Sequence, residues 1–246
     1  MRFPGATMHY FWMALITAVI LQISVFCTTI FLHRSKTHRS LDLHPVVAFL
    51  MHLHLTVFTG VVPREWVAVH RKHHHLSDAE GDPHSPLVFG LWKVLFGNYF
   101  LYKKETTNPA TIRKYTPEWK NDPIDHIPGM HYGVFFGLGV FCLMFGLQWG
   151  VVAWVAHIVL YVLLNSSINA LGHMIGYRNF KQQATNLQWL ALLTAGEGLH
   201  NNHHEYPTSA RFSLRGREFD PSWPVIRLLE SCGLATVSRL PIAKAA

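Results

Sequence analysis

The sequence predicts an all-α integral membrane protein with about three transmembrane helices, further interfacial or re-entrant helices, and a histidine-rich cytoplasmic cap. Half of the 246 residues are hydrophobic and only 14% are charged. The mean hydropathy is +0.16 despite 18 histidines, so the apolar residues must be concentrated in runs, as in a membrane protein. The histidines gather between these runs. We expect residues 1–246 to form a single domain.

The first element is an uncharged apolar run at 8–32. As a helix, 25 residues extend roughly 37 Å, which is enough to cross a bilayer. Three basic residues follow the run within seven positions, whereas only Arg2 precedes it. The positive-inside rule therefore predicts that the end at His33 faces the cytoplasm and that the N-terminus lies outside.

The second uncharged run, 46–62, contains His52 and His54. A full crossing would leave the histidines before and after it on opposite sides of the membrane, about 30 Å apart. We therefore expect a re-entrant or interfacial segment, with these two histidines in helix packing or near headgroups. Residues 87–102 are rich in aromatic side chains around Lys93, which is typical of an interfacial helix.

A polar segment with four prolines at 105–130 predicts a cytoplasmic loop. Apolar runs at 132–148 and 150–171 follow, joined by a short turn at 147–150 without Lys or Arg. This pattern predicts a transmembrane hairpin with its turn outside. Every Lys and Arg except Arg2 then lies on the histidine side. The cytoplasmic cap would consist of residues 33–130 and 172–246.

Histidines recur at the ends of these runs with regular spacing. A pair five residues apart comes first, and it would diverge by about 140° on a continuous α-helix, so it converges only if the helix ends or bends. Two later clusters have i, i+3, i+4 spacing, which puts each on one helix face. Asn169 and His173 lie one turn apart at the end of the last run. The candidate ligands are His33, His38, His70, His73, His74, Asn169, His173, His200, His203 and His204. Nine imidazoles exceed what one metal accepts, so we expect two metals.

Imidazole suits iron, copper, zinc and nickel alike. Di-iron carboxylate bundles need two Glu-x-x-His pairs, and this chain has one, Glu197 with His200. We expect Glu197 and Asp82 to orient imidazoles through their second nitrogen, with Asp78 and Glu80 as further candidates. Simple solvation of a loop is the alternative for each acid.

The other histidines carry no comparable spacing. A single histidine is more often packed or hydrogen-bonded than a ligand, and this interpretation applies to His9, His44, His52, His54, His126, His131 and His157. His75 and His84 adjoin the second cluster and stay unassigned.

Cysteine content and charge exclude several classes. Cys27, Cys142 and Cys232 are widely spaced in apolar surroundings, which favours buried thiols over a disulfide framework and cannot supply a four-thiolate site. The net charge of +7 is spread between apolar runs. It therefore favours anionic lipid headgroups or an anionic substrate over nucleic acid.

The histidine motifs resemble those of the membrane-bound fatty acid desaturases, particularly the Δ9 acyl-CoA (stearoyl-CoA) type. The family's H-x-x-x-x-H matches H-R-S-K-T-H, H-R-x-H-H matches H-R-K-H-H, and H-N-x-H-H matches H-N-N-H-H. Its N-x-x-x-H matches Asn169 to His173, and its D-P-H matches Asp82 to His84. The resemblance extends from about residue 20 to 212. The family normally has two spans before the first motif, whereas this chain offers one. Either the outer helix is missing or this is a shorter branch with an external N-terminus, and we expect the second.

The resemblance implies an O2-dependent di-iron desaturase that inserts a cis double bond, at Δ9, into a saturated acyl chain. The nine histidines would bind two iron ions, with Asn169 holding one through a water, although another metal could occupy a purified protein. No general base is assigned, because an unactivated methylene has no acidic proton and a metal–oxygen oxidant must act instead. The chain has no nucleotide fingerprint or haem segment. An external donor such as ferredoxin, rubredoxin or cytochrome b5 is therefore implied, in a bacterial cytoplasmic membrane with the active site on the cytoplasmic side.

The acyl chain, carried on coenzyme A, a carrier protein or a glycerolipid, would thread into a kinked apolar tunnel. Trp66, Trp92 and Trp189 are candidates for its wall, with ordinary packing as the alternative. Lys103, Lys104, Arg113 and Lys114 are candidates for the headgroup, with interfacial anchoring as the alternative.

Two other functions fit part of the pattern. A lipid or alkyl-chain hydroxylase would share the first hydrogen abstraction, and product analysis separates it from a desaturase. A non-catalytic histidine-rich metal-binding or transport protein would need ionisable residues along a pathway inside the spans, whereas the hairpin contains only His157.

Overall fold

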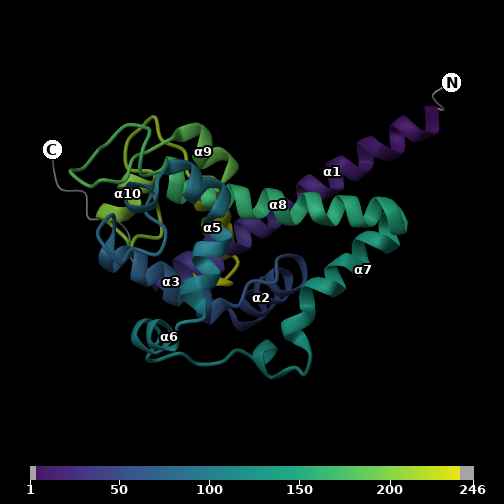
Figure 1. The fold of residues 1–246 in the computed structure, drawn as a ribbon, viewed down its shortest axis with the longest axis horizontal. Coiled ribbons are helices and arrows are strands. Elements are labelled where there is room, and N and C mark those ends of the chain that lie inside the picture. The colour runs from purple at the N-terminus through teal and green to yellow at the C-terminus, as the bar shows by residue number, and fades with distance from the viewer. Residues whose placement is uncertain (1–3, 239–246) are drawn as a thin grey trace.

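The computed structural model describes residues 4–238, whose regular secondary structure is almost all helical. Long helices form an arm at one end, and short helices and loops form a cap at the other (Figure 1). Two helices are long and apolar enough to cross a membrane, or three if one bent pair counts as a span, by length and composition among the described residues. The predicted all-α membrane fold is confirmed.

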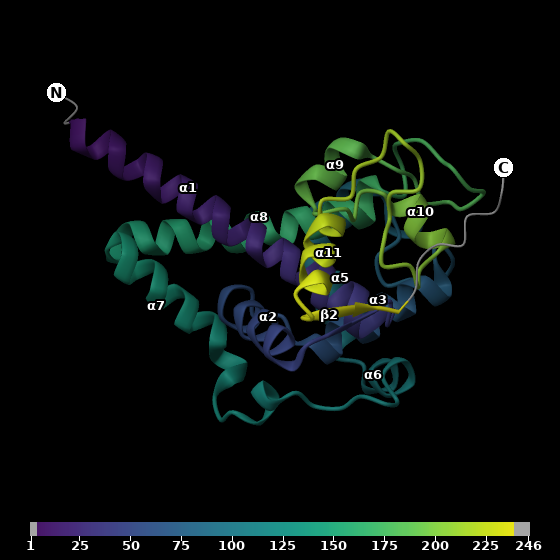
Figure 2. The ribbon, with the colours of Figure 1, turned by 180° about the vertical axis from the view of Figure 1, so that it is seen from behind.

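The first predicted span forms a helix that is longer than expected. α1 (Pro4–Cys27) continues directly into η1 (Thr28–Thr37), which is wound as a π-helix. Met8–Thr37 together form one of the two membrane-length helices. α1 lies beside α8 (Leu147–Leu171), the second of them (Figures 1 and 2).

The second apolar run does not form a straight span. α2 (Pro45–Phe58) and α3 (Pro63–Leu76) meet at an angle of 93°. The bend follows Gly60, whose φ of +68° suits glycine. Proline occupies the first turn of both helices, where its missing N–H costs no hydrogen bond. The bend agrees with a re-entrant segment, and it brings α3 back toward the end of η1.

The predicted hairpin is present, but its turn and one of its arms differ from the prediction. α7 (Gly133–Phe145) has 13 residues, roughly 20 Å, which is shorter than the apolar core of a bilayer. The turn is at Gly146 (φ +79°), so residues 147–150 belong to α8 instead of the turn. A Cβ on Gly150 would lie 2.4 Å from the Cα of Cys142, so this glycine lets the two backbones cross closely.

Shorter helices cover the sides of this framework. α4 (Pro86–Phe89) leads into α5 (Leu91–Thr106), which packs along α8 and leaves Trp92, Phe96 and Phe100 exposed, as expected of an interfacial helix. The predicted loop at 105–130 contains a further helix, α6 (Pro109–Tyr115), which packs against α3. It is followed by the single turns η2 (Pro123–His126) and η3 (Met130–Tyr132).

The cap closes over the end of η1. It contains α9 (Gln188–Leu193), α10 (His200–Glu205) and α11 (Ser222–Ser231), of which α11 packs against η1 (Figure 2). β1 (Leu41–Leu43) pairs antiparallel with β2 (Ala235–Val237), with Leu41 opposite Val237. This two-stranded ladder ties the end of the described chain to the segment that follows the first histidine pair.

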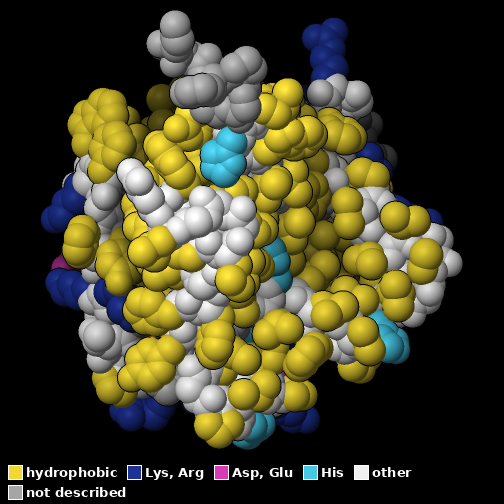
Figure 3. All heavy atoms as spheres, turned by 90° about the vertical axis from the view of Figure 1, so that its right-hand side faces the viewer, with side chains coloured by type: hydrophobic (Ala, Val, Ile, Leu, Met, Phe, Trp, Pro, Cys, Tyr) yellow, Lys and Arg dark blue, Asp and Glu magenta, His cyan; other side chains and the backbone are white. Residues whose placement is uncertain are grey.

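The end of the molecule away from the cap is apolar (Figure 3). Hydrophobic side chains dominate this view, and Lys and Arg lie mainly around its border. The three cysteines are unpaired, but only Cys27 is buried, whereas Cys142 is half-buried and Cys232 is exposed. The expectation of buried thiols is therefore wrong for Cys232.

Candidate metal centre

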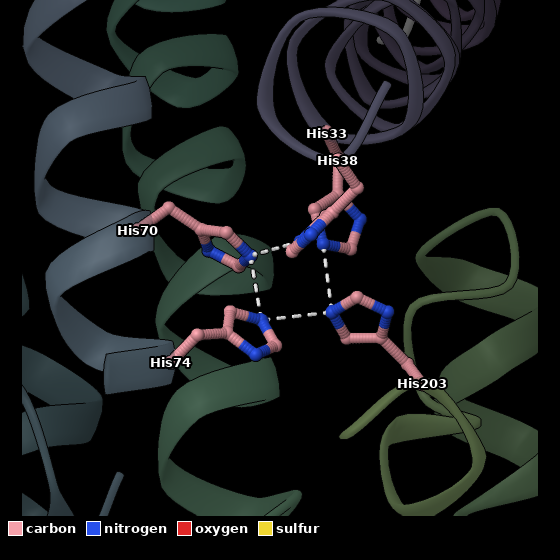
Figure 4. A group of neighbouring side chains, drawn as sticks. All are labelled: His33, His38, His70, His74 and His203. Carbon is pink, nitrogen blue, oxygen red and sulfur yellow. Dashed lines mark hydrogen bonds between the residues drawn. The ribbon is translucent and has the colours of Figure 1, made fainter. Parts of the chain in front are cut away.

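All nine predicted histidines converge in the cap, in two groups. His33, His38, His70, His74 and His203 form a five-histidine group (Figure 4), and His73, His173, His200 and His204 form a four-histidine group. Within each group the candidate ligand nitrogens all lie within 4.8 Å of one another. Four segments far apart in the sequence supply them, so the convergence is a property of the fold. Each group could hold one metal ion.

The first pair converges because its helix changes winding. The N–H of His38 donates to the carbonyl of His33 over 3.1 Å, an i→i+5 bond. A π-helical turn takes up the extra residue that would otherwise rotate the two rings apart. Their ring centroids are 4.8 Å apart. The helix ends at Thr37, directly before His38, as the sequence predicted, and its wider π-helical winding brings the two rings together.

The two H-x-x-H-H motifs share one geometric rule. On α3, the i, i+4 pair His70 and His74 enters the five-histidine group, while His73 turns to the four-histidine group. On α10 the i, i+4 pair His200 and His204 enters the four-histidine group, while His203 joins the other. Neighbouring residues differ by about 100° around an α-helix, so each of these helices can supply ligands to both groups.

The Nε2 atoms of the five-histidine group face one another at close range. They form a chain with separations of 3.2 Å (His38–His70), 3.0 Å (His70–His74), 2.9 Å (His74–His203) and 3.0 Å (His203–His33) (Figure 4). In a neutral imidazole one nitrogen is protonated and the other carries a lone pair. Lone pairs that converge at this distance repel each other unless a cation lies among them. The donor set therefore fits a bound metal ion.

Three buried carboxylates fix the orientation of these rings. Glu197 accepts a hydrogen bond from Nδ1 of His33 at 2.7 Å. Asp82 accepts from Nδ1 of His73 at 2.9 Å, and Asp78 from Nδ1 of His173 at 2.7 Å. A proton held at Nδ1 leaves the lone pair of Nε2 free for a metal. Glu197 thus contacts His33 instead of the neighbouring motif histidine, His200. Glu80, the remaining candidate acid, is exposed.

The surroundings lower the pKa of Asp82 and the pKa values of the three histidines on α10. Burial opposes ionisation of Asp82, but the hydrogen bond from His73 and nearby imidazoles lower its pKa to about 2. Burial and the neighbouring imidazoles lower the pKa values of His200, His203 and His204 well below the usual value for histidine. Neutral imidazole is the form that binds a metal.

A third cluster, His73, Asp82 and His84, adjoins the four-histidine group. It shares His73 with that group, and the Asp82 oxygens already accept from His73 and from the N–H groups of Asp78 and His84. We therefore interpret this cluster as one that orients the His73 ring, and not as a third metal site. Both ring nitrogens of His84 are buried without a partner among the described residues, and the sequence left this residue unassigned.

A largely apolar cavity of about 760 Å³ extends from the histidines into the helical arm. This volume is typical of a small-molecule pocket. His33, His70, His200 and Asn169 line its inner part. Val134, Trp154, Ile158 and Val159 belong to the part of the wall that α7 and α8 supply.

Only two of the candidate substrate residues line the described cavity. Trp66 lines it and stacks on His70, with centroids 4.8 Å apart, and Lys103 also lines it, 3.9 Å from Glu65. Trp92 and Trp189 are exposed and are absent from its described lining. The same is true of Lys104, Arg113 and Lys114.

Several polar residues of this region were not among the residues predicted from the sequence. Asn98 and Tyr102 line the cavity, and their Oδ1 and hydroxyl atoms are buried without a partner among the described residues. Both lie on α5, where the aromatic pattern indicated only an interfacial helix. No spacing signal distinguishes them from other residues of that run.

Asn186 is a second omission, and it holds the third motif. α10 has no capping side chain of its own. The Oδ1 of buried Asn186 instead accepts from the N–H groups of Asn201 (3.0 Å) and Asn202 (3.3 Å), and its Nδ2 donates to Asn202. A residue 14 positions upstream of His200 thus caps the helix that carries three candidate ligands.

Comparison with known proteins gives a consistent match. The fatty acid desaturase family model matches residues 10–216. The chain is similar to "Delta-9 acyl-lipid desaturase 2" of Arabidopsis thaliana, at 30% identity over 96% of this chain and 78% of that protein. It is 34% identical to "sn-1 stearoyl-lipid 9-desaturase" of Anabaena variabilis, over 86% of this chain and 78% of the relative. "Acyl-CoA C20 Delta5-desaturase" of Anemone leveillei is 32% identical, over 88% and 70%.

Proposed function

The chain belongs to the fatty acid desaturase family, and on that premise we propose that it introduces a cis double bond at the Δ9 position of a saturated acyl chain. It is a membrane protein and an oxidoreductase that desaturates fatty acyl chains. The single observation that carries the proposal is the position of the two histidine groups at the inner part of an apolar cavity. The named activities of its similar relatives, at Δ9 in two of them, support the position of the bond.

The metal is iron in this proposal. The five-histidine group would hold one ion, and the four-histidine group, with Asn169 through a water, would hold the other. Two iron ions with O2 supply an oxidant strong enough to remove hydrogen from an unactivated methylene. The all-imidazole composition of both groups, without carboxylates, supports this assignment among the described residues.

The chain's own residues position the substrate and exclude water. The apolar walls of α5, α7 and α8 would hold the acyl chain, and Trp66 would fix its path where it passes His70. Glu197, Asp82 and Asp78 would keep the imidazoles in one orientation throughout the reaction. Lys103 and Glu65 are the charged side chains of the described lining outside the centre, and we assign the headgroup end to Lys103.

The reaction needs electrons from another protein. Oxidation of the substrate supplies two hydrogen atoms, and reduction of O2 to two waters needs two further electrons and two protons. A ferredoxin, rubredoxin or cytochrome b5 type donor would provide them. We place the metal centre on the cytoplasmic side, because Lys and Arg concentrate on the histidine side of the apolar runs.

Expression in a host that lacks Δ9 unsaturated fatty acids tests this function. We expect new monounsaturated fatty acids with the double bond at Δ9, determined by mass spectrometry of derivatised lipids. His73→Ala should abolish them and reduce the metal content of the purified protein, whereas Glu80→Gln should change neither. A hydroxylated product without an alkene would establish the hydroxylase instead, and unchanged lipids with full metal content would contradict both enzymes.

A further inference from the structure

The two histidine groups reach the molecular surface along one edge. Six of the nine histidines are buried, while His38, His74 and His204 are only half-buried. The ring centroids of His38 and His74 are 4.7 Å apart, and those of His74 and His204 are 4.4 Å apart with nearly parallel planes. We call these three residues the exposed histidine edge. It contains members of both groups.

Basic side chains lie next to this edge. His75, exposed and adjacent to His74, is bonded through Nδ1 to the hydroxyl of Tyr115 at 2.8 Å. The Lys114 ammonium lies 5.1 Å from the centroid of the Tyr115 ring. Arg71 donates to the carbonyls of Tyr115 and Thr37, and thereby links α6 to the end of η1. α6 is thus held beside the edge.

The same region carries further cations and one paired acid. Arg39 directly follows His38, is 63% exposed, and donates to Glu118 at 3.1 Å. Arg113 is exposed on α6. We call Arg39, Arg71, Arg113 and Lys114 the basic patch. Among the described residues that line the acyl cavity, none belongs to it, so these cations have no evident role at the substrate headgroup.

We propose that the basic patch docks the electron donor, a small acidic redox protein, over the exposed histidine edge. The inference rests on the proposed desaturase function, because that reaction takes two electrons from an external donor. Electron transfer slows exponentially with distance, so a donor at this edge is better placed than one over the buried histidines. Opposite charges steer the two proteins together and fix their orientation.

Each double bond formed requires two docking events, because the donor delivers one electron at a time. Each encounter oxidises the donor by one electron and reduces the metal centre by one. Two encounters supply two electrons, which with two protons and the two hydrogen atoms of the substrate convert O2 into two waters. The oxidised donor must therefore dissociate quickly from the basic patch. Charges at the rim of an interface suit this requirement, because they act mainly on the association rate.

The test uses the iron-loaded full chain in phosphatidylcholine nanodiscs, with reduced plant-type [2Fe–2S] ferredoxin, an acidic protein, as the probe. The double variant R113E/K114E should raise the KM for ferredoxin about tenfold at low salt. The difference should shrink near 0.5 M salt, because screening shortens the range of the charges to about 4 Å. Glu118→Lys should lower the KM for ferredoxin. The control K93E/R227E makes the same change in net charge on α5 and α11 and should leave this KM within about twofold of the parent.

A second measurement separates docking from chemistry. Protein reduced anaerobically with dithionite and then mixed with O2 should form the same amount of alkene in R113E/K114E as in the parent chain. An unchanged KM for ferredoxin, or a raised KM for the acyl substrate alone, would overturn the docking proposal while leaving the desaturase intact. Absence of alkene from the parent chain with both reductants would overturn the function and the docking together.

Discussion

Nδ1 of His33 donates a hydrogen bond to the carboxylate of Glu197 over 2.7 Å, and both side chains are almost fully buried. The hydroxyl of Thr29 donates to the same oxygen of Glu197. These two bonds hold the carboxylate on η1, although Glu197 belongs to the segment before α10. The pair therefore joins the first and third histidine motifs and determines which nitrogen of His33 faces the five-histidine group.

Glu197→Gln tests this relationship. The amide keeps the shape but replaces one acceptor oxygen with a donor, so the preferred tautomer of His33 is lost. We expect metal affinity to fall about 10–100-fold, as is usual when the partner of a liganding histidine is removed. Metal content after dialysis against a graded series of chelator concentrations measures the change. Glu80→Gln is the matched control, because it makes the same change at an exposed acid. Equal retention of metal by the two variants would contradict the role of Glu197.

Asn186→Leu should release α10. The N–H of Asn202, at the start of the helix, would be buried without an acceptor, which costs about 1–3 kcal/mol. The N–H of Asn201 would keep only its bond to the carbonyl of Thr185. We expect lower thermal stability and reduced binding of both metal ions. Asn186→Asp retains the acceptor and should retain more metal than the leucine variant. Asn108→Ala removes the cap of α6, where Asn108 accepts from the N–H of Ala110, and should cost about 1 kcal/mol without loss of metal.

Arg34 and Asp220 form an ion pair with both side chains fully buried, in which Nη2 donates to both oxygens at 3.0 Å. Arg34→Met leaves the carboxylate buried and unpaired, so we expect a loss of about 3–5 kcal/mol in the free energy of unfolding. Arg39→Met breaks the exposed pair with Glu118 and should cost at most about 1 kcal/mol. Denaturant titration in one detergent measures both. Similar costs for the two variants would show that burial does not decide the contribution.

Gly150→Ala should disturb the hairpin of α7 and α8. The added Cβ would lie 2.4 Å from the Cα of Cys142, and backbone atoms cannot yield as a side chain does. The helices must separate, at a cost of about 1–3 kcal/mol. Gly139→Ala on α7 is the control, because its Cβ meets nothing within 4 Å. Thermal unfolding in matched detergent should show a lower midpoint for Gly150→Ala only; coincident midpoints would refute the close crossing.

Much of the candidate centre could be predicted because its information is local. The spacing of His70, His73 and His74 puts them on one side of a helix. Charge asymmetry predicts that all the histidine clusters lie on one side of the membrane. The bend between α2 and α3 could be predicted because a straight span would put the first two histidine motifs on opposite sides of the membrane. The long helices could be predicted because the length of an apolar run is read directly from the sequence.

The remaining features depend on tertiary contacts or on small changes in backbone winding. A π-helix and an α-helix of the same residues differ only in which carbonyl each N–H meets, so composition does not distinguish them at η1. The hairpin turn lies at Gly146 and not at the predicted 147–150. Gly150 lies within α8, where it permits the close crossing with Cys142. The sequence did not single out Asn186 as a helix cap or Asp78 as a partner of a histidine, because the residues that they contact come from other segments. The 105–130 loop was assigned from its prolines, yet Pro109 starts α6 in the first turn, where proline is tolerated.

The division of α3 and α10 between the two histidine groups has a consequence for how the centre assembles. Because each helix contributes to both groups, an ion captured by one group fixes the rotation and distance of the helices that form the other. The first ion thus lowers the entropic cost of ordering the second set of ligands. Loading should therefore be cooperative, with molecules that carry both ions or neither, and partial occupancy of a preparation would reflect a mixture of these two populations.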